Sequence, residues 1–369
     1  MTEFDYDDLG LLVGFEIHQE LDTHKLFCNC PSELRDDEAL INIDRELRPT
    51  QSELGEVDRA ALAEAVKSKR FSYLIHPENV CLVEMDEEPP HPVNKEAQDI
   101  ALEISLLLNS NPADEAHVMR KTVIDGSNTA GFQRTILIAT GGEIKIDNKK
   151  VNILTICLEE DAARKSGEEK DKVSYQLDRL GIPLIEIATA PDFNHPDKAK
   201  EAALKIGQIL RATGKVKRGI GTIRQDINIS IEDGARQEIK GVQELSLISK
   251  VIEIEVERQV KLLEIKEELE NRGAEEISEE IRDVTQVFLN TNSKILQKSL
   301  QKNGVVQAVK LPKFNGLIGK ELTENHRFGT ELADYAKVYS NVKGIFHTDE
   351  LPGNGISKEE VKNLRKELS

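Results

Sequence analysis

Three acidic segments embedded in apolar, strand-like runs constrain the fold of this chain more than any other feature. They are Gly14-Phe15-Glu16-Ile17-His18, Leu158-Glu159-Glu160-Asp161 and Leu184-Ile185-Glu186-Ile187. Successive side chains of an extended strand alternate between its faces, so Glu16 and His18 share one side while Phe15 and Ile17 lie on the other. The pattern predicts strands that each have one packing face and one working face.

Carboxylates in such strands predict a metal site. A buried carboxylate is costly unless it is paired or bound to a metal, because burial disfavours its charged form. If the segments converge, they suit Mg²⁺ better than zinc, since oxygen ligands dominate and no cysteine lies beside them, and Mn²⁺ could replace Mg²⁺. The candidate catalytic and metal-site residues are Glu16, His18, Glu160 and Glu186.

Two alternatives stay open for these segments. Glu159 and Glu160 would point to opposite faces of an extended strand, so we expect only one of them to reach the ion. We favour Glu160, although strand alternation alone does not decide between them. The other interpretation is that each segment is an edge strand with a solvated acid and that no metal site forms.

The composition is that of a globular protein, and its charge limits the classes of function. The 369 residues suggest two or three domains, and the formal net charge is -18 at pH 7. This acidity argues against a protein that holds nucleic acid by a uniformly positive surface, so any such contact must be local. The acidic first residues do not resemble a signal peptide, and no segment is apolar enough to span a bilayer. We therefore expect a cytoplasmic protein without membrane contact.

The cysteines give no clear metal-site spacing. They are Cys28, Cys30, Cys81 and Cys157. Without a secretion signal we expect them to be reduced. Only one residue separates Cys28 from Cys30, which is tighter than the spacing typical of zinc sites, and no second close pair follows. We therefore expect half-buried thiols and consider structural zinc unfavoured.

Periodicity predicts the elements that would position these segments. Glycine-containing turns predict two hairpins, one about Gly141-Gly142 and one about Asp233-Gly234. Apolar stripes predict helices over 196–213 and 245–271. From about residue 284 the pattern changes to short strands and helices, and Ser357 with Glu360 three residues later predicts a capped final helix.

Two further groups of polar residues are candidates for binding a substrate or nucleotide. Arg120 and Lys121 precede a loop of small polar residues that contains Ser127 and Asn128, a composition that suits phosphate or carboxylate binding but lacks the ending of a Walker P-loop. The alternative is an ordinary surface loop. The second group is Arg224, Asp226 and Asn228, which share one face of a predicted strand. They could position a polar substrate, or they could form a solvated face.

Taken together, six blocks in order resemble the B/E family of tRNA-dependent amidotransferase subunits over almost the whole chain. They are 13–21, 26–30, 120–128, 158–162, 183–188 and 224–228. The resemblance implies an α+β fold: a cradle-like, mixed-sheet, kinase-type catalytic domain over 1–283, followed by a partial α+β insertion domain over 284–369 like that of bacterial aspartyl-tRNA synthetases. The rest of this insertion and the family's further helical and tail domains are expected to be missing, so we expect the insertion domain to be incomplete at its C-terminus.

The resemblance also implies an ATP-dependent ligase in protein biosynthesis. Family members phosphorylate the γ-carboxylate of glutamate esterified to tRNA(Gln), and ammonia then displaces the phosphate. Carried over by motif, the metal positions are His18, Glu160 and Glu186, with Glu16 close by, and Arg120, Lys121 and the 224–228 strand surround the nucleotide and glutamyl ends. In the archaeal branch an asparaginase-like amidotransferase partner would supply the ammonia. The alternatives are a noncatalytic tRNA-binding or assembly module and a metal hydrolase.

Overall fold

The computed structural model is a mixed α+β fold, as predicted. It describes residues 4–46, 48–49, 51, 54–66, 69–147, 149–169, 171–277, 280–340, 342 and 344–368. The chain divides into two compact units. One comprises residues up to Glu232 together with Arg236–Ile252, and the other comprises Asp233–Ala235 and the residues from Glu253 onward. The expected boundary at residue 283 stays a prediction.

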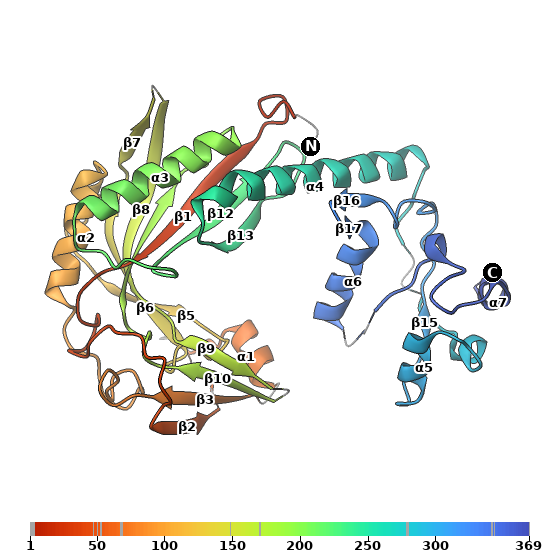
Figure 1. The fold of residues 1–369 in the computed structure, drawn as a ribbon, viewed down its shortest axis with the longest axis horizontal. Helices are drawn as coiled ribbons and strands as arrows, with labels where there is room; N and C mark the ends of the chain where they lie inside the picture. Colours follow the sequence, from red (N-terminus) through yellow and green to blue (C-terminus); the bar gives the residue numbers. More distant parts are fainter. Residues whose placement is uncertain are drawn as a thin grey trace. The chain divides into compact units, whose positions relative to one another are not determined.

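A large antiparallel sheet organises the first unit (Figure 1). Its strands follow the order β13-β12-β1-β11-β8-β6-β4, with β5 beside β6 and β7 beside β8. Their bounds are β1 Leu12–Glu20, β4 Asn111–Pro112, β5 Val118–Thr122, β6 Phe132–Thr140, β7 Glu143–Ile146, β8 Lys149–Glu160, β11 Pro183–Thr189, β12 Ile223–Ser230 and β13 Gln237–Val242. The three acidic segments therefore lie on three adjacent strands, since β1 pairs with β11 and β11 with β8.

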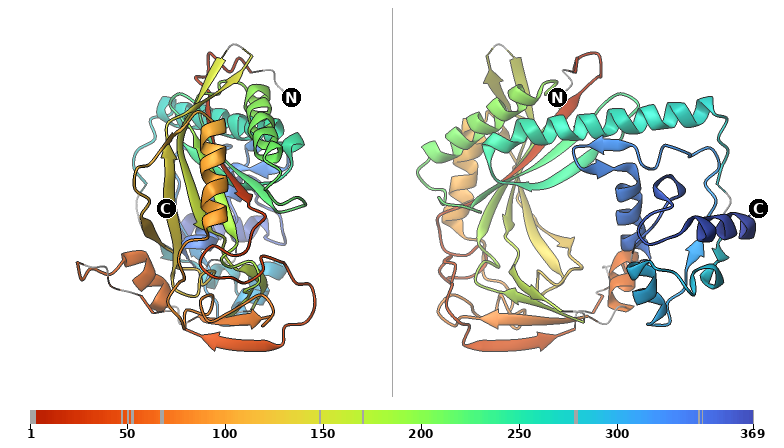
Figure 2. Two further views of the ribbon diagram at one scale, coloured as in Figure 1. Left: turned by 90° about the vertical axis from the view of Figure 1, so that its left-hand side faces the viewer. Right: turned by 45° about the vertical axis from the view of Figure 1, so that its right-hand side comes forward.

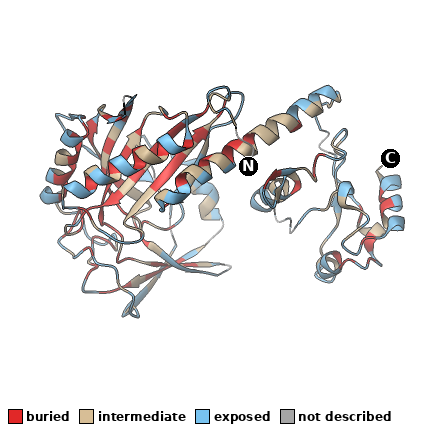
Figure 3. Cartoon of the chain, turned by 45° about the horizontal axis from the view of Figure 1, so that its top comes forward, coloured by how far each residue is buried: buried red, intermediate tan, exposed pale blue. Residues whose placement is uncertain are grey.

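The two faces of this sheet differ as the alternation predicts. Val13, Phe15 and Ile17 of β1 are at most 1 % exposed, on the face opposite Glu16 and His18. Helices α2 (Lys95–Leu107) and α3 (Pro196–Ala212) lie along one face (Figure 2): α2 packs against β4, β6 and β8, and α3 against β1 and β7. In Figure 3 the covered strands are largely buried, whereas the outer faces of the helices are exposed.

The helix predictions are confirmed. The predicted helix over 196–213 is α3, which begins with Pro196 after the N-cap His195 and buries Ala199, Ala202 and Ile206 on one stripe. The predicted helix over 245–271 is α4 (Leu245–Asn271), and the left-handed φ of 63° at Gly273 follows its end. The short helix α1 (Arg59–Val66) buries no side chain among its residues.

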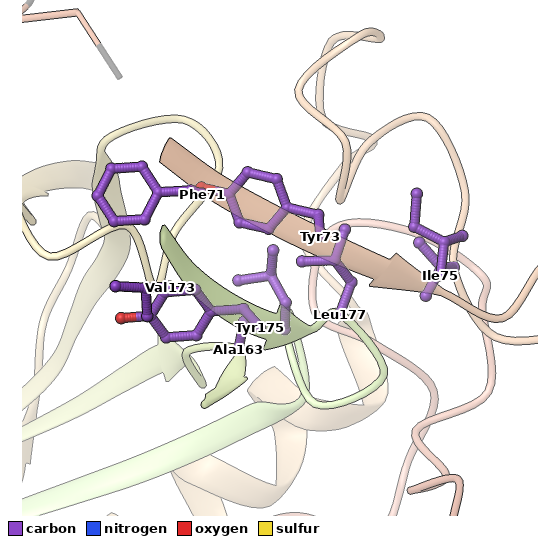
Figure 4. Packing of buried hydrophobic residues seen from close by; sticks show 9 residues of the cluster. Phe71, Tyr73, Ile75, Ala163, Val173, Tyr175 and Leu177 are labelled. Carbon is purple, nitrogen blue, oxygen red and sulfur yellow. The ribbon is translucent and has the colours of Figure 1, made fainter. Parts of the chain in front are cut away.

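A smaller mixed sheet forms the rest of the first unit. Its order is β2-β3-β10-β9, and β3 and β10 run parallel. The bounds are β2 Ile41–Arg45, β3 Arg70–Ile75, β9 Arg164–Glu168 and β10 Lys172–Gln176. Phe71, Tyr73 and Tyr175 are at the centre of its apolar cluster (Figure 4). The hydroxyls of Tyr73 and Tyr175 donate to the backbone carbonyls of Gly126 and Asp125, so this cluster fixes the loop that follows β5.

One hairpin prediction is confirmed and the other is wrong. β12 and β13 pair about the turn at Asp233, whose φ is 60°. Around Gly141-Gly142, by contrast, β7 pairs with β8 and not with β6. A Cβ at Gly142 would meet Ser110 Oγ at 2.3 Å, and its φ is 119°. The glycine pair thus allows close approach of the chain beside α2, a need that sequence cannot distinguish from a tight turn.

The second unit consists of short elements. They are β14 Arg282–Asp283, η1 Thr285–Phe288, α5 Lys294–Leu300, β15 Gln307–Ala308, β16 Glu321–Thr323, β17 His326–Arg327, α6 Phe328–Tyr339, η2 Thr348–Glu350 and α7 Lys358–Glu367. β14 pairs with β15, and β16 with β17. The predicted capping box is present: Ser357 Oγ accepts from the backbone N–H of Glu360, and Glu360 accepts from that of Ser357. One apolar cluster of this unit surrounds Val284, Phe288 and Leu364, and another surrounds Ile265, Leu317 and Leu322. In the described part of the chain, none of the helices has the length and apolarity needed to cross a bilayer.

Candidate metal centre

Strand register brings His18 and Glu186 face to face. His18 of β1 is the direct partner of Glu186 on β11 and of Arg224 on β12, and Glu186 is the partner of Cys157 on β8. Directly paired residues of antiparallel strands project from the same face. The open face of the sheet therefore collects side chains from four strands into one row.

His18, Glu159 and Glu186 form the candidate metal centre on this face. One ligand atom from each lies within 4.8 Å of the others. His18 Nε2 is 3.2 Å from Glu186 Oε2, and both side chains are 14 % exposed, so the centre is open to a ligand. Two carboxylates and one imidazole fit Mg²⁺ or Mn²⁺, which take mainly oxygen ligands.

The charges at this centre are coupled. Burial and the charge of Glu186 raise the pKa of Glu159. Burial also opposes ionisation of Glu186, but the hydrogen bond and charge of His18 outweigh it and lower the pKa of Glu186. Burial disfavours the charged form of His18, yet the hydrogen bond to Glu186 and the charges of Glu186 and Asp226 raise its pKa. Two close carboxylates beside one imidazole therefore leave negative charge that a cation can neutralise.

Glu159 is held in place by neighbouring strands. Thr135 Oγ1 donates to Glu159 Oε1 at 2.8 Å, and Gln133 Nε2 donates to Oε2 at 3.2 Å. Lys121 Nζ lies 3.7 Å from Glu159 and 4.0 Å from Glu186, and its side chain is 61 % exposed. The predicted basic residue Lys121 thus stands at the rim of the centre, where it can also meet an anionic substrate.

The structure places Glu159, and not the favoured Glu160, beside His18 and Glu186. Glu160 points to the opposite side of β8 and is 4 % exposed. Its carboxylate accepts from the backbone N–H of Arg134 at 3.0 Å and lies 3.1 Å from Arg134 Nη1. Strand alternation predicted that the two glutamates point to opposite faces, and the register places Glu159 on the face of His18 and Glu186. Glu160 forms a buried ion pair with Arg134 on the other face, and burial raises the pKa of its carboxyl although Arg134 opposes this.

The remaining acid of β1 belongs to a neighbouring group. Glu16 is the partner of Asp226, and a ligand atom from each lies within 4.8 Å of one from Glu238. Asn228 Nδ2 donates to Glu16 Oε1 at 3.5 Å, and Lys240 Nζ lies 3.2 Å from Asp226. The prediction that Arg224, Asp226 and Asn228 share a face is confirmed, and it is the face of Glu16 and His18.

A buried charged cluster that was not predicted lies on the same face at the C-terminal end of β1, around Glu20. Glu20 is 2 % exposed, and burial and Asp161 raise its pKa to about 7. Asp161 accepts from Arg224 at 3.1 Å, and Lys217 Nζ lies 3.9 Å from Glu20. The spacing of Glu16, His18 and Glu20 at every second residue was the available signal, because it places Glu20 on the working face.

The other predicted substrate residues lie away from the centre. Arg120 is the partner of Arg134 and therefore lies on the face of Glu160, with its guanidinium 5.5 Å from the Phe132 ring centroid. Ser127 donates from its backbone N–H and its hydroxyl to Asp125. Asn128 is 2 % exposed. The structure therefore does not bring Arg120, Ser127 or Asn128 together with the metal centre, and their binding roles stay predictions.

The thiols are brought together by the fold. Cys28, Cys30, Cys81 and Glu84 each place a ligand atom within 4.8 Å of the others. Cys157 lies elsewhere, on the row of His18 and Glu186. The sequence lacks a second close cysteine pair, but the turn after β3 supplies Cys81 and Glu84 to the first pair. This set is a second candidate metal site.

The fold and the site together define a class: an α+β protein with a candidate metal centre on the open face of an antiparallel sheet. The chain belongs to the GatB/GatE catalytic domain family, whose profile matches residues 11–310, and the GAD domain family matches residues 296–369. The second match covers most of the segment where we expected an insertion domain.

Archaeal proteins named as the E subunits of glutamyl-tRNA(Gln) amidotransferases are similar over the whole chain. The protein of Methanocaldococcus jannaschii is 60 % identical over 365 residues, which are 98 % of this chain and 58 % of that protein. Those of Methanococcus maripaludis strain C7 and Sulfolobus acidocaldarius are 56 % and 54 % identical over 100 % of this chain, covering 58 % and 59 % of their own lengths. The chain therefore spans somewhat more than half the length of these relatives.

Proposed function

We propose that this chain contributes the phosphoryl-transfer site of a tRNA-dependent amidotransferase, on a kinase-type cradle fold. In this proposal ATP phosphorylates the γ-carboxylate of glutamate esterified to tRNA(Gln), and ADP leaves. Ammonia then attacks the activated carbonyl, and phosphate leaves to give the amide. The oxide of a free carboxylate is too poor a leaving group for direct amidation, which is why phosphorylation must come first.

The observation that carries this proposal is the convergence of His18, Glu159 and Glu186 on the open face. These residues would hold Mg²⁺ or Mn²⁺, which when bound offsets charge on the transferring phosphoryl group. Thr135 and Gln133 orient Glu159 through hydrogen bonds. Lys121 lies beside both carboxylates, and its exposed ammonium can also bind phosphate oxygens.

Arg224 and the neighbouring charged cluster support binding of the second substrate. The guanidinium of Arg224 is oriented by Asp161, at 3.3 and 3.1 Å, directly beside His18 in the strand register. A guanidinium held in this way can bind the γ-carboxylate of the esterified glutamate through paired hydrogen bonds. Ammonia must reach the activated carbonyl unprotonated, because ammonium is not a nucleophile. This favours delivery by a partner protein of the asparaginase type, and we place the complex in the cytoplasm.

The test is release of phosphate from ATP in the presence of glutamyl-tRNA(Gln), with ammonium chloride as the nitrogen source. We expect turnover that needs Mg²⁺ or Mn²⁺, and at least about a 100-fold loss in Glu186→Gln, because a ligand and a charge are removed together. Glu201→Gln, on the solvent side of α3, is the matched control and should keep full turnover. Equal turnover of Glu186→Gln and the parent chain would exclude the proposed role of the centre.

The second candidate function is a noncatalytic tRNA-binding module. Basic side chains outnumber acidic ones over residues 284–369, whereas the whole chain carries a net charge of -18, and a positively charged segment favours contact with RNA phosphates. Calorimetry separates the two candidates. A binding module would take up tRNA with a steep salt dependence but neither ATP nor Mg²⁺, whereas the phosphoryl-transfer site takes up both.

A further inference from the structure

The loop between α3 and β12 carries the most exposed of the large apolar side chains in the described part of the chain. Ile220 is 99 % exposed, at the tip of the turn formed by residues 217–222. Gly219 and Gly221 on either side of it have left-handed φ angles of 122° and 86°, and a Cβ at either position would meet nothing within 4 Å. The tip of the loop therefore projects into open space from the first unit.

Hydrogen bonds to β1 fix the stem of this loop. Gln19 of β1 is 2 % exposed, and its Nε2 donates to the carbonyls of Lys217 at 3.1 Å and Thr222 at 3.0 Å. The backbone N–H of Glu20 also donates to the Thr222 carbonyl, at 2.9 Å. The hydroxyl of Thr222 donates to the Gly219 carbonyl at 2.9 Å, which closes the turn. Because the stem is held in place, the exposed tip needs little ordering when it meets a ligand.

The sequence around the loop is locally basic, although the whole chain carries a net charge of -18. No acidic residue lies between Glu201 and Asp226. The basic residues of this stretch are Lys205, Arg211, Lys215, Lys217, Arg218 and Arg224. A positive stretch of this kind is the local contact that an acidic protein needs in order to bind nucleic acid.

The cations of the loop itself differ in their partners. Lys215 Nζ lies 2.6 Å from Glu103, and Lys217 turns inward to donate to the carbonyl of Ser32. Arg218 is exposed, and no ion pair involves it in the part of the chain that the structure describes. An exposed guanidinium beside an apolar tip suits single-stranded nucleic acid, which offers phosphates together with the apolar faces of unpaired bases.

The loop leads directly into the open face of the large sheet. It continues into β12, where Arg224 is the direct partner of His18. Four residues of extended chain span at most about 14 Å, so the backbone of Ile220 lies within that distance of the backbone of Arg224. In the proposed function Arg224 binds the γ-carboxylate of a glutamate whose α-carboxyl is esterified to the last nucleotide of the tRNA. The unpaired nucleotides beside the ester therefore reach the region of this loop.

We propose that residues 217–222 form a binding site for the unpaired 3′-terminal nucleotides of the aminoacyl-tRNA. Ile220 packs against the face of a base, and Arg218 binds a phosphate of the backbone. Contacts of these two kinds hold single-stranded RNA, so the loop positions the ester end of the substrate while Arg224 holds the carboxylate. This inference rests on the proposed function, because that function brings the esterified end of the tRNA to Arg224.

The first experiment maps the contact and needs neither ATP nor turnover. A photoreactive benzophenone amino acid replaces Ile220 in the whole chain, which is then irradiated with tRNA(Gln). We expect crosslinks to the unpaired 3′-terminal nucleotides, identified by nuclease digestion and mass spectrometry. The same amino acid in place of Leu204, which is 44 % exposed on α3, is the matched control and should not crosslink there.

The outcomes separate this inference from the proposed function. No crosslink from position 220, or crosslinks only to paired regions of the tRNA, would overturn the inference. Phosphate release that depends on glutamyl-tRNA(Gln), found without this crosslink, would overturn the inference alone. A crosslink to the 3′-terminal nucleotides by a chain that shows no such release would support the inference and refute only the proposed function.

Variants then measure the contact through the dissociation constant of tRNA(Gln). Ile220→Ser should weaken binding at least about fivefold, because it removes the packing on a base. Removing the unpaired 3′ nucleotides from the tRNA should weaken binding to the parent chain by a similar factor but leave binding to Ile220→Ser nearly unchanged. Leu204→Ser should bind both RNAs as the parent chain does. Equal effects of the shortened tRNA on the parent chain and on Ile220→Ser would contradict the proposed contact.

Arg218→Gln tests the phosphate contact separately. It should reduce the slope of binding against salt concentration by about one phosphate contact, because one cation no longer displaces counterions from the RNA. An unchanged salt slope in Arg218→Gln would contradict the role of this residue.

Discussion

His18 and Glu186 are direct partners on two antiparallel strands, and His18 Nε2 lies 3.2 Å from Glu186 Oε2. The two residues are 168 positions apart in the chain, so only the sheet register brings them together. Because Glu159 of the next strand joins them, a short row across three strands supplies the donor set of the candidate metal centre.

The roles of Glu159 and Glu160 should separate experimentally. Glu159→Gln should weaken Mn²⁺ binding at least about tenfold, because it removes a ligand charge. It should change stability little, because burial and Glu186 raise the pKa of Glu159 and so disfavour its charged form. Glu160→Gln should lower the free energy of unfolding by about 3 kcal/mol, since it leaves Arg134 buried without its counter-charge. Mn²⁺ titration and urea unfolding of both variants check this. The reverse pattern would restore Glu160 as the ligand.

Glu20 should make the protein less stable as the pH rises. Burial and Asp161 raise its folded pKa to about 7, from an ordinary value of 4.5, while Lys217 and Arg179 partly oppose them. The folded state then binds more protons than the unfolded state between these values, so stability falls as the pH increases through this window. Glu20→Gln mimics the protonated acid.

Unfolding of this variant across the same window gives the check. Glu20→Gln should match the parent chain near pH 4.5 and be more stable by on the order of 2 kcal/mol at pH 8. A constant difference between the two chains at every pH would mean that Glu20 does not titrate in this range.

Gly126 should be far less replaceable than Gly131, although both have a left-handed φ, of 85° and 74°. A Cβ at Gly126 would lie 2.2 Å from the Phe71 ring, whereas one at Gly131 meets nothing within 4 Å. Gly131→Ala should cost about 1 kcal/mol for the backbone alone, and Gly126→Ala about 3 kcal/mol because the aromatic cluster must also shift. Urea unfolding measures both, and equal costs would argue against the close contact.

The capping box should stabilise the last helix. Ser357→Ala removes the side-chain acceptor of the Glu360 N–H and should cost about 1 kcal/mol in the second unit. Ser357→Asp restores an acceptor and should recover most of the loss. Thermal unfolding followed by circular dichroism measures this loss of stability. If Ser357→Ala unfolds like the parent chain, the N-terminus of this helix does not depend on the capping box.

Local patterns predicted much of the fold. Alternation identified the two faces of β1, and the apolar stripes located α3 and α4, because each pattern lies within one element. The Gly141-Gly142 hairpin was wrong because a close contact with Ser110, distant in sequence, requires the same residue type as a turn. The local preferences of residue types carry no information about that contact.

The site was predictable only where strand alternation decided the outcome. Alternation placed Glu16 and His18 on one face of β1, but the choice between Glu159 and Glu160 needed the register of β8 against β11. The gathering of Cys81 and Glu84 with Cys28 had no local signal, because Glu84 lies 56 residues beyond Cys28 in the chain.

The most direct measurement is a crystal structure of the chain soaked in Mn²⁺, read by anomalous scattering. We expect one strong peak bound by His18 Nε2 and by the carboxylates of Glu159 and Glu186, weakened or lost in Glu186→Gln. A peak beside Glu160, or Mn²⁺ bound by Glu16, Asp226 and Glu238 with nothing at His18, would contradict it.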